Sequence, residues 1–486
     1  MPIGARRSAL LAGATLAASL VQAPARADDL RAALLSAYAT NPQLNAAREN
    51  QRAVDESVPI ARADGLPSLN ASAQETEYVK RADAVPDQLS YSRLFSLGGT
   101  LNVPVYSGGG VRNAISGAET RVAAGRNDLR GSESSVFSQV VATYMDVILN
   151  EAVVRLNQAQ VQTLDVNLQA TRDRFEIGDL TRTDVAQSQS RLALARGQLQ
   201  SAQANLANAR ERYIQFVGRP PVDLQPPPPL PGLPATADDA VAIALDRNPD
   251  LLAARERSKA ARFDTRAAGA ARLPKVSLFA DTARTDFLGS ANVNGASVAV
   301  PTTTTADVGV RATIPLYQGG RPTALVKQAQ AREGAALENE IAAERAVIAQ
   351  ARAAWSSWQA ANAIIVSSQT AVDAATLSLE GVRAENSVGN RTIIDILNAE
   401  QELVNAQLQL VTARRNAYVA GFTLLAAMGR AEARDLGLDG GPLYDPGIHY
   451  QQARGTFWDW GSDPTPRAKS TRTVDTPSQN GTINAK

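Results

Sequence analysis

Two segments of the chain alternate apolar and other residues with the period of a β-strand. In 95–105 and in 306–316, every second residue is apolar or glycine, and those between are mostly polar. Such alternation is typical of a strand with one apolar and one polar face. Looser candidates precede them at Ser68–Lys80 and Lys275–Asp286. The sequence therefore predicts four strands. Their length of about ten residues suits a tilted transmembrane strand, and equally a half-buried sheet of a soluble protein.

A seven-residue period follows each strand pair. In the first half it places apolar residues at Val140, Val147, Val154, Val161, Leu168 and Phe175. The second half answers with Trp358, Ile365, Val372 and Leu379. A sustained heptad seam predicts coiled-coil packing of long helices. A helix over 117–175 has about 59 residues and a length of ~90 Å. Alanine is abundant on its other faces, so such a helix can contact neighbours on two flanks and join a closed ring of helices.

The two halves of the chain repeat one another. Segment 41–49, which begins Asn-Pro-Gln-Leu, recurs at 248–256 after a shift of 207 residues. Farther along, a shift of 211 residues relates Pro104 to Pro315, Gly178 to Gly389, Asp184 to Asp395, and Gly218 to Gly429. A shift held over more than a hundred residues indicates an internal duplication. Each half is expected to run helix, strand pair, long helix, turn and helix.

The duplication sets the expected organisation of the chain. We expect a signal peptide at 1–27, a first repeat at 28–224, a proline-rich connector at 225–237, a second repeat at 238–430, and a C-terminal segment at 431–486. Arg6 and Arg7, an apolar run and Ala25-Arg26-Ala27 form the pattern of a secretory leader cleaved before Asp28. The end of the chain, from about Asp463, has the composition of a disordered tail.

Composition excludes several functions. The 49 basic and 48 acidic residues nearly cancel, which gives no nucleic-acid footprint. The chain has no cysteine, which excludes disulfides and thiolate metal sites. The single histidine, His449, has no second ligand of its type. No phosphate loop, nucleophile elbow or paired histidine is found. We therefore expect no enzyme activity, no cofactor and no bound metal.

Four strands are too few to close a barrel, which needs about eight. Strands that enter a membrane leave no edge unpaired. If these strands enter a membrane, the chain must oligomerise, with each subunit donating two strand pairs. The expected fold class is an α+β membrane protein with long coiled-coil helices. Two alternatives use the same patterns: a periplasmic coiled-coil scaffold without a pore, and an ordinary porin, which has no need of such long helices.

These features together resemble the TolC family of outer-membrane efflux and secretion ducts. The most specific stretch is Val388–Gln401, Val-Gly-Asn-Arg-Thr-Ile-Ile-Asp-Ile-Leu-Asn-Ala-Glu-Gln, and Gly178–Val185 is its first-half counterpart. Both are similar to the family's turns at the periplasmic tip, where Gly178 and Gly389 would lie. A Pro-x-Tyr-x-Gly-Gly motif resembles the family's strand-to-helix transition, with key residues Pro104, Gly108, Gly109, Pro315, Gly319 and Gly320.

The resemblance implies a homotrimer. Three chains would form a twelve-stranded β-barrel in the outer membrane, continuous with a long α-helical coiled-coil barrel in the periplasm. The C-terminal segment would lie at the equator of that barrel. A periplasmic adaptor would join the duct to an inner-membrane transporter of the ABC or RND type. Proteins, small toxic compounds or both would be exported. The 388–401 stretch looks most like members that serve type I protein secretion.

The resemblance also implies a gate at the periplasmic aperture. Arg391, Asp184 and Thr183 occupy the positions that hold the family's aperture shut, and Asp395 occupies that of an acidic ring. The chain departs from the family at two of these positions: Asn398 replaces a carboxylate of the second acidic ring, and Asn386 replaces a tyrosine that helps to latch the aperture.

A simpler interpretation of the two aspartates is helix capping. Both fall in the first turn of a helix, where a carboxylate meets free backbone N–H groups. Capping and gating are compatible.

Overall fold

The computed structural model describes residues 28–80, 88–438 and 443–483. The expected signal peptide, 1–27, lies outside them. The first half contains α1 (Leu30–Thr40), α2 (Pro42–Asp55), α3 (Ser57–Ala63), β1 (Ser68–Glu77), β2 (Leu89–Tyr91), β3 (Arg93–Tyr106), α4 (Gly110–Glu176) and α5 (Arg182–Val217). The second contains α6 (Ala237–Arg247), α7 (Pro249–Gly269), the 3-10 turn η1 (Ala270–Arg272), β4 (Lys275–Asp286), β5 (Ala291–Val293), β6 (Ala296–Ser297), β7 (Thr303–Thr313), α8 (Arg321–Ser387) and α9 (Ile393–Ala427). Helix α10 (Pro446–Arg454) follows.

The four predicted strands form one antiparallel sheet in the order β1-β3-β4-β7. Its register aligns like residues across all four strands. One row is apolar and consists of Leu69, Leu101, Ala280 and Val308. The next row points to the opposite face and consists of Asn70, Thr100, Asp281 and Asp307. The sheet therefore has an apolar and a polar face, and β1 and β7 are its two edges.

Two details of the sheet differ from the prediction. The last strand was expected to reach residue 316, but β7 ends at Thr313, which pairs with the first residue of β4, Lys275. Beyond that point β7 has no neighbouring strand to bond. A second small sheet, β2-β5-β6, lies beyond the far ends of the main strands and was not predicted.

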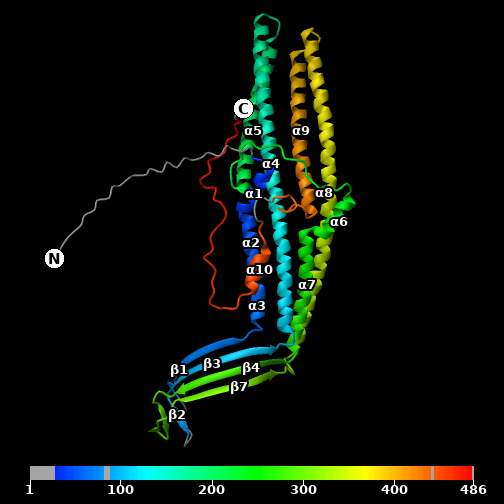
Figure 1. Cartoon of the computed structure of the whole chain (residues 1–486). Helices are drawn as coiled ribbons and strands as arrows, with labels where there is room; N and C mark the ends of the chain where they lie inside the picture. The colour runs from blue at the N-terminus through cyan, green and yellow to red at the C-terminus, as the bar shows by residue number, and fades with distance from the viewer. Residues whose placement is uncertain (1–27, 81–87, 439–442, 484–486) are drawn as a thin grey trace, which may run out of the picture.

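Helices α4 and α8 each have 67 residues, a length of about 100 Å at 1.5 Å per residue. The chain reverses after each of them, and the next helix packs alongside, so that α4–α5 and α8–α9 form two helical hairpins. The tips of both hairpins lie far from the sheet (Figure 1). The heptad seam is buried along much of α4, with Val140, Val147 and Val154 fully covered. Phe175, at the tip end, is 42% exposed. None of the described helices is long and apolar enough to cross a membrane.

The repeated Asn-Pro motif joins short helices to the hairpins in the same way in both halves. Asn41 accepts backbone hydrogen bonds at the start of α2, and its amide donates to the carbonyl of Phe216 at 3.0 Å. Asn248 caps α7 equally, and its amide donates to the carbonyl of Ala427 at 2.9 Å. One side chain thus caps a helix and fastens it to the end of a hairpin.

The C-terminal segment lies against the first half. His449 of α10 is 3.0 Å from the buried carboxylate of Asp55. Residues 463–483 form neither helix nor strand, and some of them contact α5. Arg210 of α5 donates to the carbonyl of Asn480 at 2.8 Å, and the backbone N–H of Gln479 donates to Glu211. Backbone groups make these contacts, so side-chain composition did not reveal them.

Candidate functional site

The tips of the two hairpins have the same local design. Gly178 follows α4 with φ +81°, and Gly389 follows α8 with φ +82°. Both are in the left-handed region, which glycine adopts without a steric penalty. Thr181 and Thr392 then cap α5 and α9. The 178 and 389 turns therefore differ in sequence but reverse the chain alike.

Both tip aspartates belong to capping boxes. One oxygen of Asp184 accepts from the hydroxyl of Thr181 at 2.7 Å and from its backbone N–H at 2.9 Å. Asp395 does the same with Thr392, at 2.8 Å to the hydroxyl and 2.9 Å to the N–H. These hydrogen bonds lower the pKa of each carboxyl below its ordinary value, with the hydroxyl dominant at Asp184 and the backbone at Asp395. Both aspartates are therefore ionised at neutral pH.

The cation of the second tip has a partner within its own hairpin. Nε of Arg391 lies 2.6 Å from an oxygen of Glu385 across the turn, and this contact raises the pKa of Arg391. The amide of Asn386 donates to the carbonyl of Arg391 at 2.7 Å. Thr183 is exposed. Within one chain, Arg391 therefore pairs with Glu385. A contact of Arg391 with Asp184 or Thr183 requires a second chain or a movement of the hairpin tips.

Two polar contacts below the tips join the two hairpins, one through Asn398 and one through Glu400, and the sequence indicated neither of them. Asn398 accepts from Arg191 of α5 at 2.9 Å. Glu400 of α9 is buried and accepts from Asn167 of α4 and from Arg383 of α8. The only available signal was position: Glu400 follows Leu397 by three residues, on the same side of the helix as a buried leucine.

The two strand-to-helix transitions are alike in backbone but not in surroundings. Gly109 and Gly320 immediately precede α4 and α8, with φ near +80° in both. Gly108 and Gly319 also have positive φ. A Cβ on Gly108 would meet Leu273 at 2.7 Å, whereas one on Gly319 would meet nothing within 4 Å.

The prolines of the two motifs differ in place as well. Pro104 lies within β3, where the register with β4 shifts. Pro315 lies after the end of β7.

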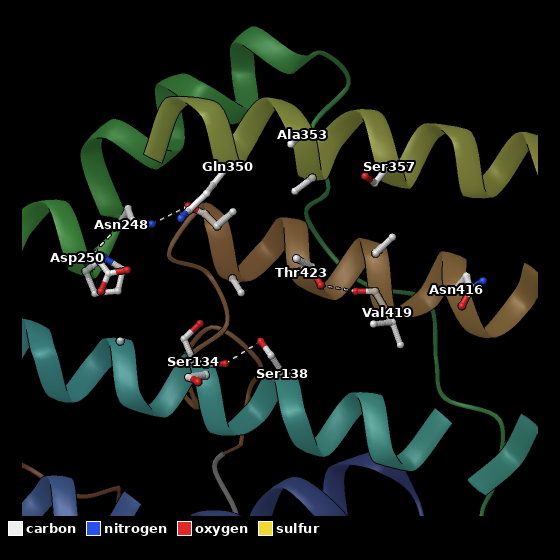
Figure 2. A pocket seen from close by; sticks show the side chains of 17 residues that line it. Ser134, Ser138, Asn248, Asp250, Gln350, Ala353, Ser357, Asn416, Val419 and Thr423 are labelled. Atoms are coloured by element: carbon white, nitrogen blue, oxygen red, sulfur yellow. Dashed lines mark hydrogen bonds between the residues drawn. The ribbon is translucent and has the colours of Figure 1, made fainter. Parts of the chain in front are cut away.

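A cavity of about 610 Å³ lies between α4, the start of α7, α8 and α9. In Figure 2, Ser134 and Ser138 of α4 lie across it from Val419 and Thr423 of α9. Its lining is small and mostly uncharged, and it includes none of the tip residues. Among residues 28–80, 88–438 and 443–483, no cluster of histidine and carboxylate side chains could hold a metal ion.

Two long hairpins with charged tips, standing on a sheet with an apolar face and two free edges, define the architecture of an outer-membrane export channel. A family model described as Outer membrane efflux protein matches residues 11–219 and 240–430. The chain belongs to this family, which confirms the resemblance to TolC. It is an outer-membrane export channel, and its family consists of channel proteins rather than enzymes. The scaffold without a pore is not supported.

Known relatives cover most of the chain. It is 33% identical over 432 residues to the outer membrane efflux protein BepC of Brucella suis biovar 1, covering 88% of this chain and 91% of that one. It is 28% identical over 429 residues to the outer membrane protein TolC of Escherichia coli K12, covering 85% and 84%. The crystal structure of the CmeC outer membrane channel of Campylobacter jejuni has the same fold, with a TM-score of 0.72, 17% identity, and 88% and 89% coverage.

Proposed function

We propose that three copies of this chain form one continuous duct. The free edges of the sheet carry this proposal, because β1 and β7 are unpaired in a single chain. Pairing β1 of one chain with β7 of the next satisfies both edges, and three copies give twelve strands. The apolar face, on which Leu69 is 76% and Val308 85% exposed, would then contact lipid.

The helices support the same assembly. α8 packs against α9 along one side, yet it exposes large apolar residues on another. Val366 and Leu377, eleven residues apart and so on one face of the helix, are 68% and 71% exposed. Removing such residues from water stabilises a periplasmic helix by roughly 25 cal/mol per Å² of apolar surface buried. The neighbouring chain would cover this face and close the ring of helices.

We propose the tips as the gate. The lowered pKa of Asp395 keeps its carboxylate charged, and three copies around the axis would form an acidic ring that attracts cations. Arg391 would exchange Glu385 for Asp184 and Thr183 of a neighbouring chain when the tips meet. Asn398 would contribute no charge to the ring. Asn386 already holds the turn through the carbonyl of Arg391.

The duct would work with other proteins. A periplasmic adaptor would bind the hairpins and join them to an inner-membrane transporter of the ABC or RND type. The transporter would supply the energy, because the chain shows no nucleotide-binding motif. Proteins of type I secretion systems, small toxic compounds or both would pass through.

The assembly is tested by native mass measurement of the detergent-extracted protein. We expect three chains per particle, and the twelve-strand arrangement requires that number. In a second test, Ala306→Pro in edge strand β7 removes a backbone N–H donor and should lower the fraction of the protein recovered as trimer. A stable monomer with its strands folded would contradict the proposal.

A further inference from the structure

Three large aromatic side chains lie close together on the surface just after α10. Phe457, Trp458 and Trp460 are 78%, 71% and 87% exposed. Aromatic side chains bury roughly 150–250 Å² each when they are covered, so leaving three of them in water is costly. Exposed apolar groups gathered in one patch commonly mark an interaction site, whereas scattered ones do not. Residues 455–462, the aromatic segment, are therefore a candidate contact surface.

The helix before the aromatic segment is fixed to the first repeat. His449 lies 3.0 Å from the buried carboxylate of Asp55 on α2. Tyr450 packs against the apolar cluster between α3 and α4. Ala453, in the last turn of α10, is buried. Because α10 is held at these three points, it presents the aromatic segment at a defined place on the molecule.

That place is the end of the helical region that meets the sheet. Arg62, in the last turn of α3, donates to the carbonyl of Arg454, in the last turn of α10, at 3.1 Å. Strand β1 begins at Ser68, a few residues after Arg62. Immediately after α10 the chain turns back beside α3 (Figure 1). The aromatic segment thus lies at the level where the chain passes from helices to strands.

We propose that the aromatic segment inserts into the headgroup region of the periplasmic leaflet of the outer membrane. The proposal rests on the insertion of the sheet into the membrane proposed above, and it adds a contact outside the sheet. Leu69, the second residue of β1, already belongs to the apolar row of the sheet. The boundary between lipid and water therefore falls close to the start of β1, which is the level of the aromatic segment.

The residue types suit a phospholipid interface. Tryptophan combines a large apolar ring with one N–H donor, and it is enriched where a membrane meets water. Arg62 and Arg454 are exposed beside the segment, and their cations can pair with lipid phosphates. Asp459 and Asp463 carry the opposite charge. The charges therefore offset one another, and the aromatic rings have to provide the attraction.

The aromatic segment lies beyond the second repeat and belongs to the C-terminal segment alone. Each chain would therefore add one membrane contact outside the barrel, and a trimer would carry three of them around its circumference. These contacts would fix the height of the helical region against the membrane surface.

Tryptophan fluorescence in vesicles that contain brominated phospholipid measures this contact, because bromine quenches only the tryptophans that it approaches closely. Two of the four tryptophans, Trp458 and Trp460, lie in the aromatic segment. Trp355 and Trp358 lie about 50 Å along α8 from its start near the sheet. If all four emit equally, lipid brominated near the headgroup should remove up to about half of the emission of the full-length protein. Lipid brominated at the ends of the acyl chains should remove less, because interfacial tryptophans lie at headgroup level.

Two double variants identify the source of the quenching. Trp458→Phe with Trp460→Phe keeps both rings apolar but removes their tryptophan emission, so the quenching should almost disappear. Trp355→Phe with Trp358→Phe is the matched control, because it leaves only the aromatic segment to emit. Its quenched fraction should be about twice that of the parent. Flotation with the vesicles and channel currents check that each variant is inserted.

The outcomes separate this proposal from the proposed function. A parent protein that neither inserts nor conducts contradicts the proposed function itself. If the parent inserts and conducts, but brominated lipid quenches it no more than Trp458→Phe with Trp460→Phe, the membrane contact is wrong. Blue-shifted emission without quenching would assign the aromatic segment to a neighbouring chain and would also overturn it. Should the control pair fail to fold, since both of its tryptophans are half-buried, the exposed pair decides the question.

Discussion

Gly429 should be far less replaceable than Gly218, its counterpart in the first repeat. Both have positive φ, +68° and +84°, so alanine at either one costs about 1–2 kcal/mol in backbone conformation. Their surroundings differ. A Cβ on Gly429 would lie 2.3 Å from the carbonyl oxygen of Arg247 and 3.0 Å from Cα of Asn248. Ordinary contacts need about 3.5 Å, so the backbone at the start of α7 would have to move by about 1 Å.

That movement would break a specific connection. Asn248 caps α7 and donates to the carbonyl of Ala427. Losing the cap and this hydrogen bond costs about 1 kcal/mol each. Gly429→Ala should therefore destabilise by about 3–4 kcal/mol. At Gly218 the nearest atoms are the hydroxyls of Thr471 and Thr40, at 2.9 and 3.0 Å. Both are side-chain atoms, so no backbone has to move, and the main loss is the hydrogen bond from Thr40 to the carbonyl of Ser36. Gly218→Ala should therefore cost the backbone penalty of about 1–2 kcal/mol and less than ~1 kcal/mol more.

Denaturant unfolding of the two purified variants, at equal protein concentration, measures the difference. The transition should shift farther in Gly429→Ala, with an unchanged slope. Equal shifts in the two variants would refute the reasoning, because the backbone penalty is common to both and only the neighbours differ.

Three further expectations follow from the tips, the sheet and the C-terminal segment. Asp395→Ala should weaken block of the channel by trivalent cations in bilayer recordings at neutral pH. Its hydrogen bonds to Thr392 lower the pKa of Asp395, so the parent's carboxylates are charged at that pH and the block should fade as acid protonates them. Equal block of the parent and Asp395→Ala at neutral pH would exclude this carboxylate. Val310→Arg, on the apolar face, should cost about 2–4 kcal/mol if it lies at mid-membrane, and outer-membrane yield should fall; an unchanged yield would place that face away from lipid. Arg210→Ala should release residues 479–483, and mass spectrometry should detect faster proteolysis there; cleavage at the parent's rate would show that Arg210 does not hold them.

Periodicity predicted the parts of the fold in which many residues repeat one signal. The strands that include 95–105 and 275–286 and the heptads from Val140 to Leu168 lie where the pattern placed them. The duplication also explained why Asn41 and Asn248 make equivalent contacts. In such elements many side chains contribute to one pattern, so a single exception, such as the exposed Phe175, does not change the predicted element.

Single contacts were beyond the reach of sequence. β2 has three residues, too few to alternate, and it pairs with β5, about 200 positions away. Glu385 became the partner of Arg391 only because the turn brings them together. Glu400 is buried, although a glutamate is normally expected at the surface. Its two partners come from separate helices, so no local spacing reveals it.

At the site, the sequence predicted local chemistry better than long-range contacts. Asp184 and Asp395 cap their helices, as their first-turn positions indicated, because a capping box is complete within four residues. Contacts of Arg391 with Asp184 and Thr183 depend on the arrangement of whole hairpins and of neighbouring chains. They stay predictions.

The most direct test of a trimeric duct that closes at its tips is the current through a planar bilayer holding the purified protein. A trivalent cation is added to one side of the bilayer and then, in a separate recording, to the other. The account predicts channels of uniform conductance that the cation blocks only from the side that the hairpin tips face. Absence of channels, or equal block from both sides, would contradict it.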